Sequence, residues 1–301
     1  MDLSIYRNKI EDLNRSRIYM KRKIKKYALI HGIIAFLIDI LIAIVVLFVV
    51  KPFYKELFML MLMPTLSLPV GVAIYNEYQK VKWMRNSYFP FILNVFNSES
   101  GSLFVNKYTE EEAKDLLIKN KLINKFDNVN NQIAFSFETS IGPVTYLNVC
   151  VSRSVGDSSV EILKGDVFII PHECHTAFQL RNDHYQTSGM VKSNMFKHKQ
   201  YKIYAYYPKE VEPFEIDEKH YSLFNSIRVL YSKFSFSNKL KEVILNYDRN
   251  FLTVYGKIDL NLEYPKVIDE KTISSSCEKI ASIKERFDEL DKIINEKKDY
   301  C

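Results

Sequence analysis

Two long apolar runs near the start of the chain dominate its pattern of hydrophobic and polar positions. Residues 29–50 are apolar except for His31 and Asp39, and residues 57–75 carry no formal charge. As helices with a rise of 1.5 Å per residue, the runs would span about 33 and about 28 Å, close to the ~30 Å hydrocarbon core of a bilayer. Because the connection between them is short, the pattern predicts a transmembrane hairpin over residues 28–76. Buried core helices are the alternative; a signal peptide would be shorter and followed by a small-residue cleavage site.

Basic residues are concentrated directly before the first run. The chain has 42 Lys plus Arg and 36 Asp plus Glu, and residues 1–27 alone contain nine basic and three acidic residues. The remaining residues are therefore neutral by count, which argues against nucleic acid as a partner. A basic segment beside an apolar run is typical of contact with anionic lipid head groups. The predicted lipid-facing cluster consists of Lys21, Arg22, Lys23, Lys25 and Lys26.

Positive charge also predicts the orientation of the hairpin. Seven basic residues occupy the fifteen positions before Leu29, and Lys80, Lys82 and Arg85 follow the second run, whereas the connection holds two lysines. The positive-inside bias then places both termini in the cytoplasm, on one side of a cell inner membrane. The four cysteines are too sparse for a disulfide framework, and we expect them to be reduced.

From residue 77 onward the pattern predicts a cytosolic α+β domain, with a mainly antiparallel sheet and helices at both ends. Thr109 and Glu112 fit a capping box that opens a helix through about Ile123, and residues 217–234 form a second predicted helix. Lys164-Gly165-Asp166 predicts a turn or bulge, and residues 152–154 a loop. The expected strands are 133–137, 144–151, 160–170, 201–207, 242–247 and 251–258, the last two joined as a hairpin at 248–250.

Both ends of the chain show apolar residues at alternating spacings of three and four. Residues 1–27 form a predicted basic amphipathic cytosolic helix, and residues 274–298 a second amphipathic helix. The spacing indicates either a coiled-coil seam, between these helices or between subunits, or helices that pack on their own domain. The seam positions are Leu3, Tyr6, Ile10, Leu13, Arg17, Met20, Ile24 and Tyr27 at the first end, with Arg17 the one misfit, and Ile280, Ile283, Phe287, Leu290 and Ile294 at the second.

Asp39 lies at the midpoint of the first apolar run, where an ionised carboxylate costs at least ~2.5–3.5 kcal/mol. If residues 57–75 form an antiparallel partner helix, Thr65 and Ser67 lie at the same depth in the bilayer as Asp39. A protonated Asp39 would then act as interhelical glue, within the hairpin or in an oligomer. The alternative is a proton or ion relay, for which a single carboxylate on two helices is a poor basis.

The segment 172–175, His-Glu-Cys-His, is the only part of the sequence where metal-ligand residue types cluster, with His184 nine positions further on. Zinc binds imidazole and thiolate, so His172, Cys174, His175 and His184 are candidate ligands, and Glu173 a candidate base. The spacing matches no standard zinc signature, and on a strand His175 would point away from His172 and Cys174. Polar residues at a strand end are the alternative. We therefore predict no cofactor.

Other catalytic or binding signatures are missing from the sequence. It contains no Walker loop, G-x-G-x-x-G or G-x-S-x-G motif, and no His is near the serines of 152–154 or 274–276 that could activate them. The tyrosine-rich segment 201–207 could stack on single-stranded bases, but a strand face is the simpler interpretation in a domain without surplus charge.

The order of these parts resembles that of a family of bacterial membrane proteins that share a domain of unknown function. The resemblance rests on two N-terminal apolar helices, Ser-Leu-Phe at 102–104, a helix, Ile-Ala-Phe-Ser at 133–136, Lys-Gly-x-x-Phe at 164–168 and a C-terminal helix. It implies a cytosolic α+β domain anchored by a helical hairpin. It supplies no catalytic residue, and the His172 cluster lies outside the family pattern.

These features predict a non-enzymatic inner-membrane protein that presents its domain for binding, scaffolding or membrane sensing. The expected partners are an anionic bilayer and a protein, either a different one or a second copy of this chain. Two other functions stay open. One is a membrane-anchored zinc hydrolase that uses His172, Cys174 and His175, and the other is a channel or relay subunit built around Asp39.

Overall fold

The computed structural model divides the chain into two compact units, residues 1–89 with 264–273 and residues 90–263 with 274–301. The structure describes residues 3–49, 55–101, 104–105, 108–139, 141–156, 158–173, 176–182, 189–192, 203–212, 214, 216–233, 242–257 and 264–296. Within these ranges, the structure describes only the backbone of residues 43, 45–49, 55–67, 131 and 132.

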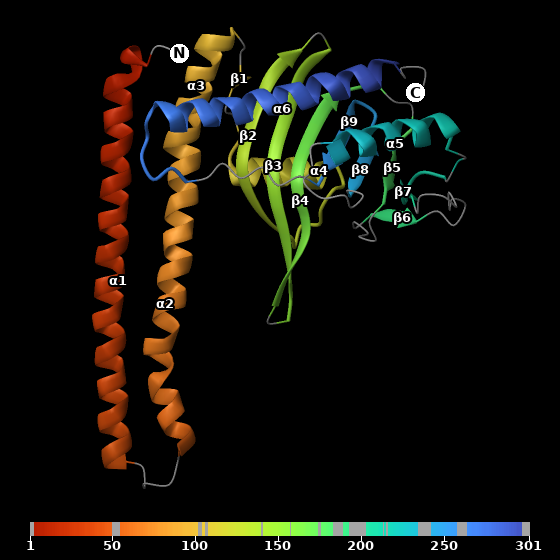
Figure 1. The fold of residues 1–301 in the computed structure, drawn as a ribbon. Helices are drawn as coiled ribbons and strands as arrows, with labels where there is room; N and C mark the ends of the chain where they lie inside the picture. Colours follow the sequence, from red (N-terminus) through yellow and green to blue (C-terminus); the bar gives the residue numbers. More distant parts are fainter. Residues whose placement is uncertain are drawn as a thin grey trace. The chain divides into compact units, whose positions relative to one another are not determined.

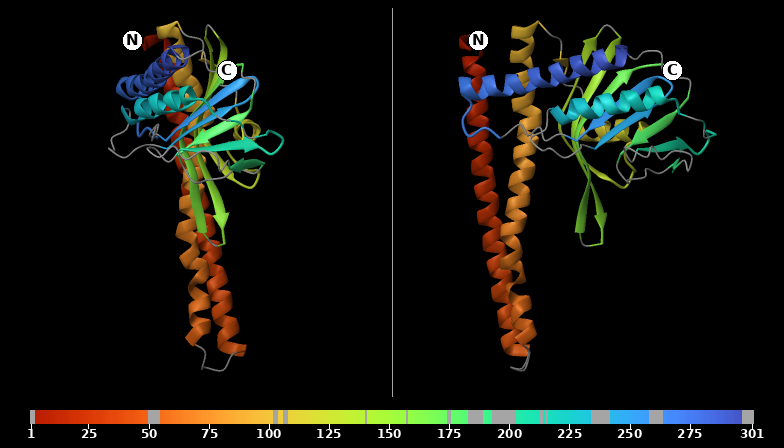
Figure 2. Two further views of the ribbon diagram at one scale, coloured as in Figure 1. Left: turned by 90° about the vertical axis from the view of Figure 1, so that its right-hand side faces the viewer. Right: turned by 45° about the vertical axis from the view of Figure 1, so that its right-hand side comes forward.

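The first unit contains two long helices that lie side by side and run antiparallel (Figures 1 and 2). A short 3₁₀ helix, η1 (Ser4–Tyr6), leads into α1 (Arg7–Val49), and α2 (Lys55–Trp83) continues into the π-helix η2 (Met84–Tyr88). Tyr27 stacks on Tyr75 with 3.9 Å between ring centroids, and Trp83 Nε1 donates a hydrogen bond of 2.9 Å to Ser16 Oγ. Both predicted apolar runs therefore lie in helices that pair with each other. In the described part of the chain, no helix has the length and apolar character that a membrane crossing requires.

The seam predicted at the start of α1 packs inside the first unit. Leu13, Met20 and Ile24 are buried, and so is the misfit Arg17. The backbone of Ile268 is fixed to the same helix, because Asn14 donates to its carbonyl at 3.0 Å and accepts from its N–H at 3.2 Å. The chain around Ile268 thus packs on α1.

The second unit is built on one nine-stranded sheet in which every pairing is antiparallel (Figure 1). The strand order is β1-β2-β3-β4-β9-β8-β5-β7-β6. This arrangement confirms the predicted α+β class. The strands are β1 (Phe104–Val105), β2 (Asn128–Thr139), β3 (Gly142–Val155), β4 (Ser158–Pro171), β5 (Phe178–Arg181), β6 (Met190–Lys192), β7 (Tyr204–Pro208), β8 (Val243–Tyr247) and β9 (Phe251–Gly256).

Helix α4 (Glu110–Lys119) packs on one face of the sheet. Its start follows the sequence prediction, because the Thr109 hydroxyl accepts from the Glu112 N–H at 3.2 Å while the Glu112 carboxylate accepts from the Thr109 N–H at 2.7 Å. These bonds satisfy backbone donors that a helix leaves free at its first turn. The apolar core on this face includes Ala113, Leu117, Leu147, Val149 and Val167.

Helices α5 (Glu218–Lys233) and α6 (Glu270–Glu296) lie over the opposite face (Figures 1 and 2). Phe287 of α6 contacts Phe137 and Phe168 of the sheet, with centroid distances of 4.9 and 5.8 Å. The apolar seam of α6 therefore packs on its own domain. All five predicted seam residues, Ile280, Ile283, Phe287, Leu290 and Ile294, are buried.

Two local predictions for the sheet are wrong. Lys164-Gly165-Asp166 is neither a turn nor a bulge, because it pairs continuously with residues 148–150 inside β4. Residues 152–154 belong to β3, where they pair with β4, and not to a loop. Helix α3 (Phe89–Ser100) and the short strands β1, β5 and β6 were not predicted.

Candidate functional site

A belt of exposed positive charge covers the sides of α1 that do not face the seam, just before the apolar run. All five residues of the predicted cluster, Lys21, Arg22, Lys23, Lys25 and Lys26, are exposed, while Ile24 among them is buried in the seam. At 3.6 residues per turn, their positions spread around the sides of the helix that do not face the seam. The belt is therefore available to an anionic surface.

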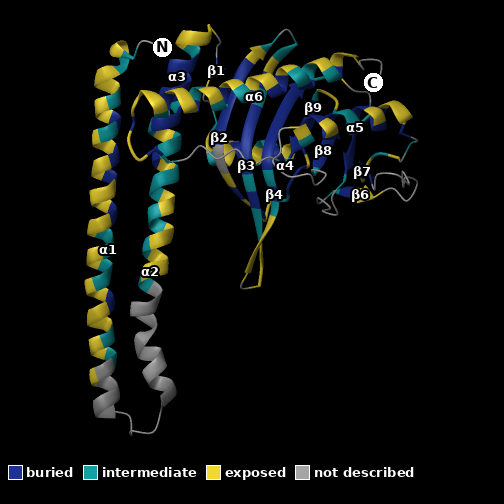
Figure 3. Ribbon diagram, in the orientation of Figure 1, coloured by how far each residue is buried: buried dark blue, intermediate teal, exposed yellow. Residues whose placement is uncertain are grey.

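Beyond the belt, many residues of α1 are exposed (Figure 3), and large apolar residues are among them. Phe36, Leu37 and Leu41 are 63%, 57% and 62% exposed. A helix on the surface of a soluble protein normally presents polar residues there. The exposed set on α1 is Leu29, Ile30, Ile33, Ile34, Phe36, Leu37, Ile38, Ile40, Leu41 and Ile44, and Val70 and Ile74 continue it on α2.

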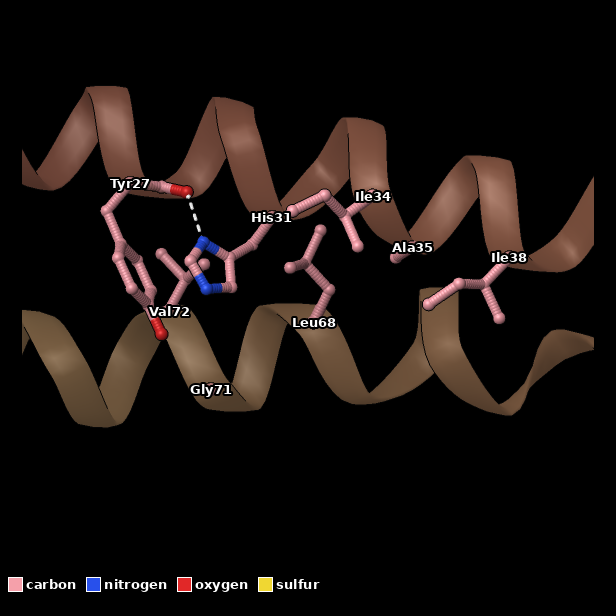
Figure 4. Close-up of a pocket in the computed structure, with 8 residues that line it drawn as sticks. All are labelled: Tyr27, His31, Ile34, Ala35, Ile38, Leu68, Gly71 and Val72. Atoms are coloured by element: carbon pink, nitrogen blue, oxygen red, sulfur yellow. Dashed lines mark hydrogen bonds between the residues drawn. The ribbon is translucent and has the colours of Figure 1, made fainter.

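A hollow of about 290 Å³ opens between the two helices at this level (Figure 4). One end is aromatic, because the rings of Tyr27 and His31 stack with 3.8 Å between centroids. The remainder of the lining is aliphatic or small. The lining residues are Tyr27, His31, Ile34, Ala35, Ile38, Leu68, Gly71 and Val72.

Small residues keep the hollow open. A Cβ atom placed on Gly71 would meet no atom within 4 Å, and Ala35 on the facing helix has only a methyl group. At Gly32, one turn earlier on α1, a Cβ would already touch Leu68 Cδ2 at 3.5 Å. The helices are thus in contact at Gly32 and leave free space beside Gly71.

The hydrogen bond of His31 indicates which ring nitrogen faces this space. His31 Nδ1 lies 3.0 Å from the Tyr27 carbonyl oxygen. Because a carbonyl oxygen can only accept, Nδ1 carries the proton, and Nε2 is the acceptor of the neutral ring. Figure 4 shows Nε2 directed toward α2. The aromatic end of the hollow therefore offers polar atoms, His31 Nε2 and the Tyr27 hydroxyl, beside apolar walls.

Asp39 lies one residue beyond Ile38, at the far end of the hollow. Its side chain is partly exposed, but its Oδ1 is buried and accepts no hydrogen bond within the described part of the chain. The predicted partners Thr65 and Ser67 have side chains outside the described residues. Their pairing with Asp39 stays a prediction.

The predicted zinc cluster lies mostly outside the described residues, since Cys174, His175 and His184 all do. His172 and Glu173 follow β4, and the His172 N–H donates to the Asn250 carbonyl at 3.0 Å. Among the residues that the structure describes, no group of three His, Cys, Asp or Glu side chains could hold a metal ion.

The second unit contains a buried ionic cluster that the sequence interpretation missed. Asp166 of β4 is fully buried and accepts three hydrogen bonds. Arg286 Nη2 donates to Oδ2 at 2.9 Å, and Tyr146 Oη and Asn148 Nδ2 donate to Oδ1 at 2.6 and 3.0 Å. Burial raises the pKa of Asp166, although Arg286, Tyr146 and Asn148 act in the opposite direction. Burial and the neighbouring Asp166 also raise the pKa of Tyr146 well above its usual value.

This cluster holds structure in place and is not arranged for chemistry on a substrate. Asp166 and Arg286 are 0% and 4% exposed, so no solvent-borne molecule reaches the carboxylate in this conformation. Two features of the sequence place these two charges in a core, although neither feature identifies the partner. Asp166 shares a strand face with Phe168, and Arg286 directly precedes the seam residue Phe287, so both charges occupy positions that face a core.

In comparisons with known proteins, no protein family, curated protein or solved structure matches this chain.

Proposed function

We propose that α1 and α2 anchor this protein in a membrane and that its α+β unit is a cytosolic binding module. One observation carries the proposal. The sides of α1 that do not pack on α2 expose large apolar side chains over residues 29–44, directly after an exposed basic belt. Soluble monomers rarely expose continuous apolar surface larger than a few hundred Å². Lipid tails complement the apolar surface, and anionic head groups complement the basic belt.

The sequence continues this surface in both helices. Residues 45–50 and 57–67 are apolar apart from Thr65 and Ser67, and they extend the runs past the last described side chains. The basic ends of both runs then lie at one face of the bilayer, with Lys80 and Lys82 near the end of α2. The positive-inside bias makes this face the cytoplasmic one.

The α+β unit supports a binding role better than a catalytic one. Its most perturbed ionisable groups, Asp166, Tyr146 and Tyr231, are buried in the core where α5 and α6 meet the sheet. Their position serves to fix the helices on the sheet. A module of this kind, attached to a hairpin, would act by holding a partner at the membrane.

Alkaline carbonate extraction of membranes from cells that express the full chain tests the anchor. We expect the protein to stay in the membrane pellet. A double variant, Leu37→Asp with Leu41→Asp, should move into the supernatant, because each central Asp costs ~2.5–3.5 kcal/mol in a bilayer. The matched control is Val155→Asp with Val160→Asp, at two exposed apolar residues of the sheet, which should stay in the pellet. Complete extraction of the unmodified protein would disprove the anchor.

Labelling of Cys301 in intact cells tests the orientation. A membrane-impermeant thiol reagent should leave Cys301 unmodified until the cells are opened. Modification in intact cells would show that the termini face the opposite side.

A further inference from the structure

We propose that the hollow between α1 and α2 binds one acyl chain of an anionic phospholipid, with the lipid phosphate held at its basic end. This inference rests on the membrane anchor proposed above, and it adds a defined lipid site to what would otherwise be a general attraction to the bilayer surface. Three observations support it: the shape of the hollow, its polar end and the distribution of charge.

The shape suits a single extended chain. The hollow is about 290 Å³, near the lower end of the range for small-ligand sites. It follows α1 from Tyr27 to Ile38, over which a helix rises about 16 Å. Its walls along this length are the side chains of Ile34, Ala35, Ile38 and Leu68, together with the open space at Gly71. An apolar site that extends along α1 over this length fits part of an acyl chain.

The aromatic end of the hollow suits the region where a lipid chain joins its head group. Tyr27 is held between two rings, with His31 at 3.8 Å and Tyr75 at 3.9 Å. Nε2 of His31, directed toward α2, and the hydroxyl of Tyr27 add polar atoms at this level (Figure 4). Aromatic and amphipathic rings are enriched at this depth of a bilayer.

The charge around this end selects an anionic head group. Lys23 lies one helical turn before Tyr27, where i and i+4 residues are neighbours, and it is exposed. No acidic residue occurs between positions 13 and 38. On α2 the carboxylate of Glu77 is paired with Lys80 at 2.6 Å. A phosphate without a balancing amine therefore complements the surface better than a zwitterionic head group does.

Native mass spectrometry of the detergent-purified full chain tests the site, with phosphatidylglycerol and phosphatidylcholine as the probes. We expect the unmodified protein to retain one phosphatidylglycerol at least tenfold better than phosphatidylcholine. Gly71→Leu should abolish this retention, because its side chain fills space that is open in the structure. The matched control is Val70→Leu on the adjacent, exposed position of α2, which should retain the lipid. Equal retention by the Gly71→Leu and Val70→Leu variants would overturn the proposal.

A second pair of variants tests the head-group contact. Lys23→Gln should reduce the preference for phosphatidylglycerol over phosphatidylcholine about fivefold, which is the effect expected for one cation near an anionic surface. Lys9→Gln, an exposed position more than three turns earlier on α1, should leave the preference unchanged. An equal loss in both variants would show that the attraction is general and that no head-group site exists.

Failure of the lipid site can be distinguished from failure of the membrane anchor. The Gly71→Leu variant should remain in the carbonate-extracted membrane pellet even though it has lost its lipid. If the unmodified protein is extracted by carbonate, the anchor fails. If it stays in the pellet but retains both lipids equally, only the lipid site fails.

Discussion

Asp166 of β4 and Arg286 of α6 form an ion pair with 2.9 Å between Oδ2 and Nη2, although 120 positions separate them in the chain. Both side chains are buried. Removal of a single partner from a buried pair leaves an uncompensated charge, whereas removal of both partners leaves none. The pair therefore fixes α6 to the sheet, and the second unit needs α6 to satisfy the buried charge of β4.

Breaking this pair should destabilise the second unit strongly. We expect Arg286→Met to lower the free energy of unfolding by about 3–5 kcal/mol, and the double variant with Asp166→Asn to recover much of that loss. Thermal unfolding followed by circular dichroism measures both. Glu242→Gln, at the exposed pair of Glu242 with Lys257, is the control and should change stability by at most ~1 kcal/mol. Equal effects in the two single variants would contradict the role of the buried pair.

Gly256 should not tolerate a side chain, because α5 lies directly on it. A Cβ at this position would collide with the ring of Tyr231. Gly256→Ala should therefore destabilise the second unit by at least ~1–3 kcal/mol in a thermal unfolding measurement. Tyr231→Phe keeps the ring but removes a buried hydroxyl that has no hydrogen-bond partner in the described structure, so it should be neutral or stabilising. A harmless Gly256→Ala would mean that α5 is not seated as described.

Arg17 should limit the stability of the first unit. It is 8% exposed within an apolar seam, and its Nε and Nη1 hydrogen-bond to no described residue. Buried nitrogens of a charged group that lack hydrogen bonds are costly, and an apolar residue of similar volume avoids that cost. We expect Arg17→Met to raise the melting temperature of the purified protein, with a gain of about 1–4 kcal/mol. Arg15→Met, on the exposed side of α1, should change stability by less than ~0.5 kcal/mol.

The Cys277 thiol should react slowly at neutral pH. Burial, with Glu99 and Glu278 nearby, raises its pKa from 9.0 to about 11. Since the thiolate is the reactive form, alkylation by iodoacetamide at pH 8 should be about a hundredfold slower than for an ordinary cysteine, and should rise through pH 11. Peptide mapping by mass spectrometry gives the rate at this residue. A rate that levels off below pH 9 would contradict the raised pKa.

The same thiol makes a pH-dependent contribution to stability. Between pH 9 and 11 the folded protein keeps the proton that the unfolded chain has already lost. The contribution is therefore complete below pH 9 and is lost as the pH rises toward 11. Cys277→Ser should show a smaller loss of stability over this interval than the unmodified protein.

Asp39 should act as an interhelical hydrogen-bonding group. Its Oδ1 is buried and unpaired within the described residues. If a second copy supplies the partner, Asp39→Leu should weaken self-association in liposomes, measured by resonance energy transfer, about threefold or more. Asp39→Asn, which keeps a donor and an acceptor, should associate normally. Unchanged association of the Leu variant would leave Thr65 and Ser67 of the same chain as the predicted partners.

Much of the fold was predictable because its signals are local. The capping box at Thr109, the hairpin at 248–250 and the helix over 217–234 all rest on residues close together in sequence, and all are present. The seam of α6 was also evident, but whether it packed on the sheet or on another helix was not. That choice depends on Phe137 and Phe168, which no spacing rule connects to Phe287.

The prediction for residues 164–166 failed because their structure depends on residues far along the chain. Lys164-Gly165-Asp166 has the composition of a turn, yet it continues β4 because Arg286 neutralises Asp166 from a distant helix. A charge that is satisfied by a partner far along the chain cannot be recognised from its neighbours alone. The hollow between α1 and α2 is similar, because it is lined by residues of two different helices, among them Ala35 of α1 and Gly71 of α2.

The late position of α6 in the chain has a consequence for biosynthesis. The residues that cover Phe137 and Phe168 are translated more than a hundred codons after them, at about 5–20 residues per second. For several seconds the nascent sheet would present an uncovered aromatic face, while the paired apolar helices have already emerged. A ribosome that stalls before Arg286 would therefore release a chain whose aromatic sheet face is uncovered, which favours aggregation.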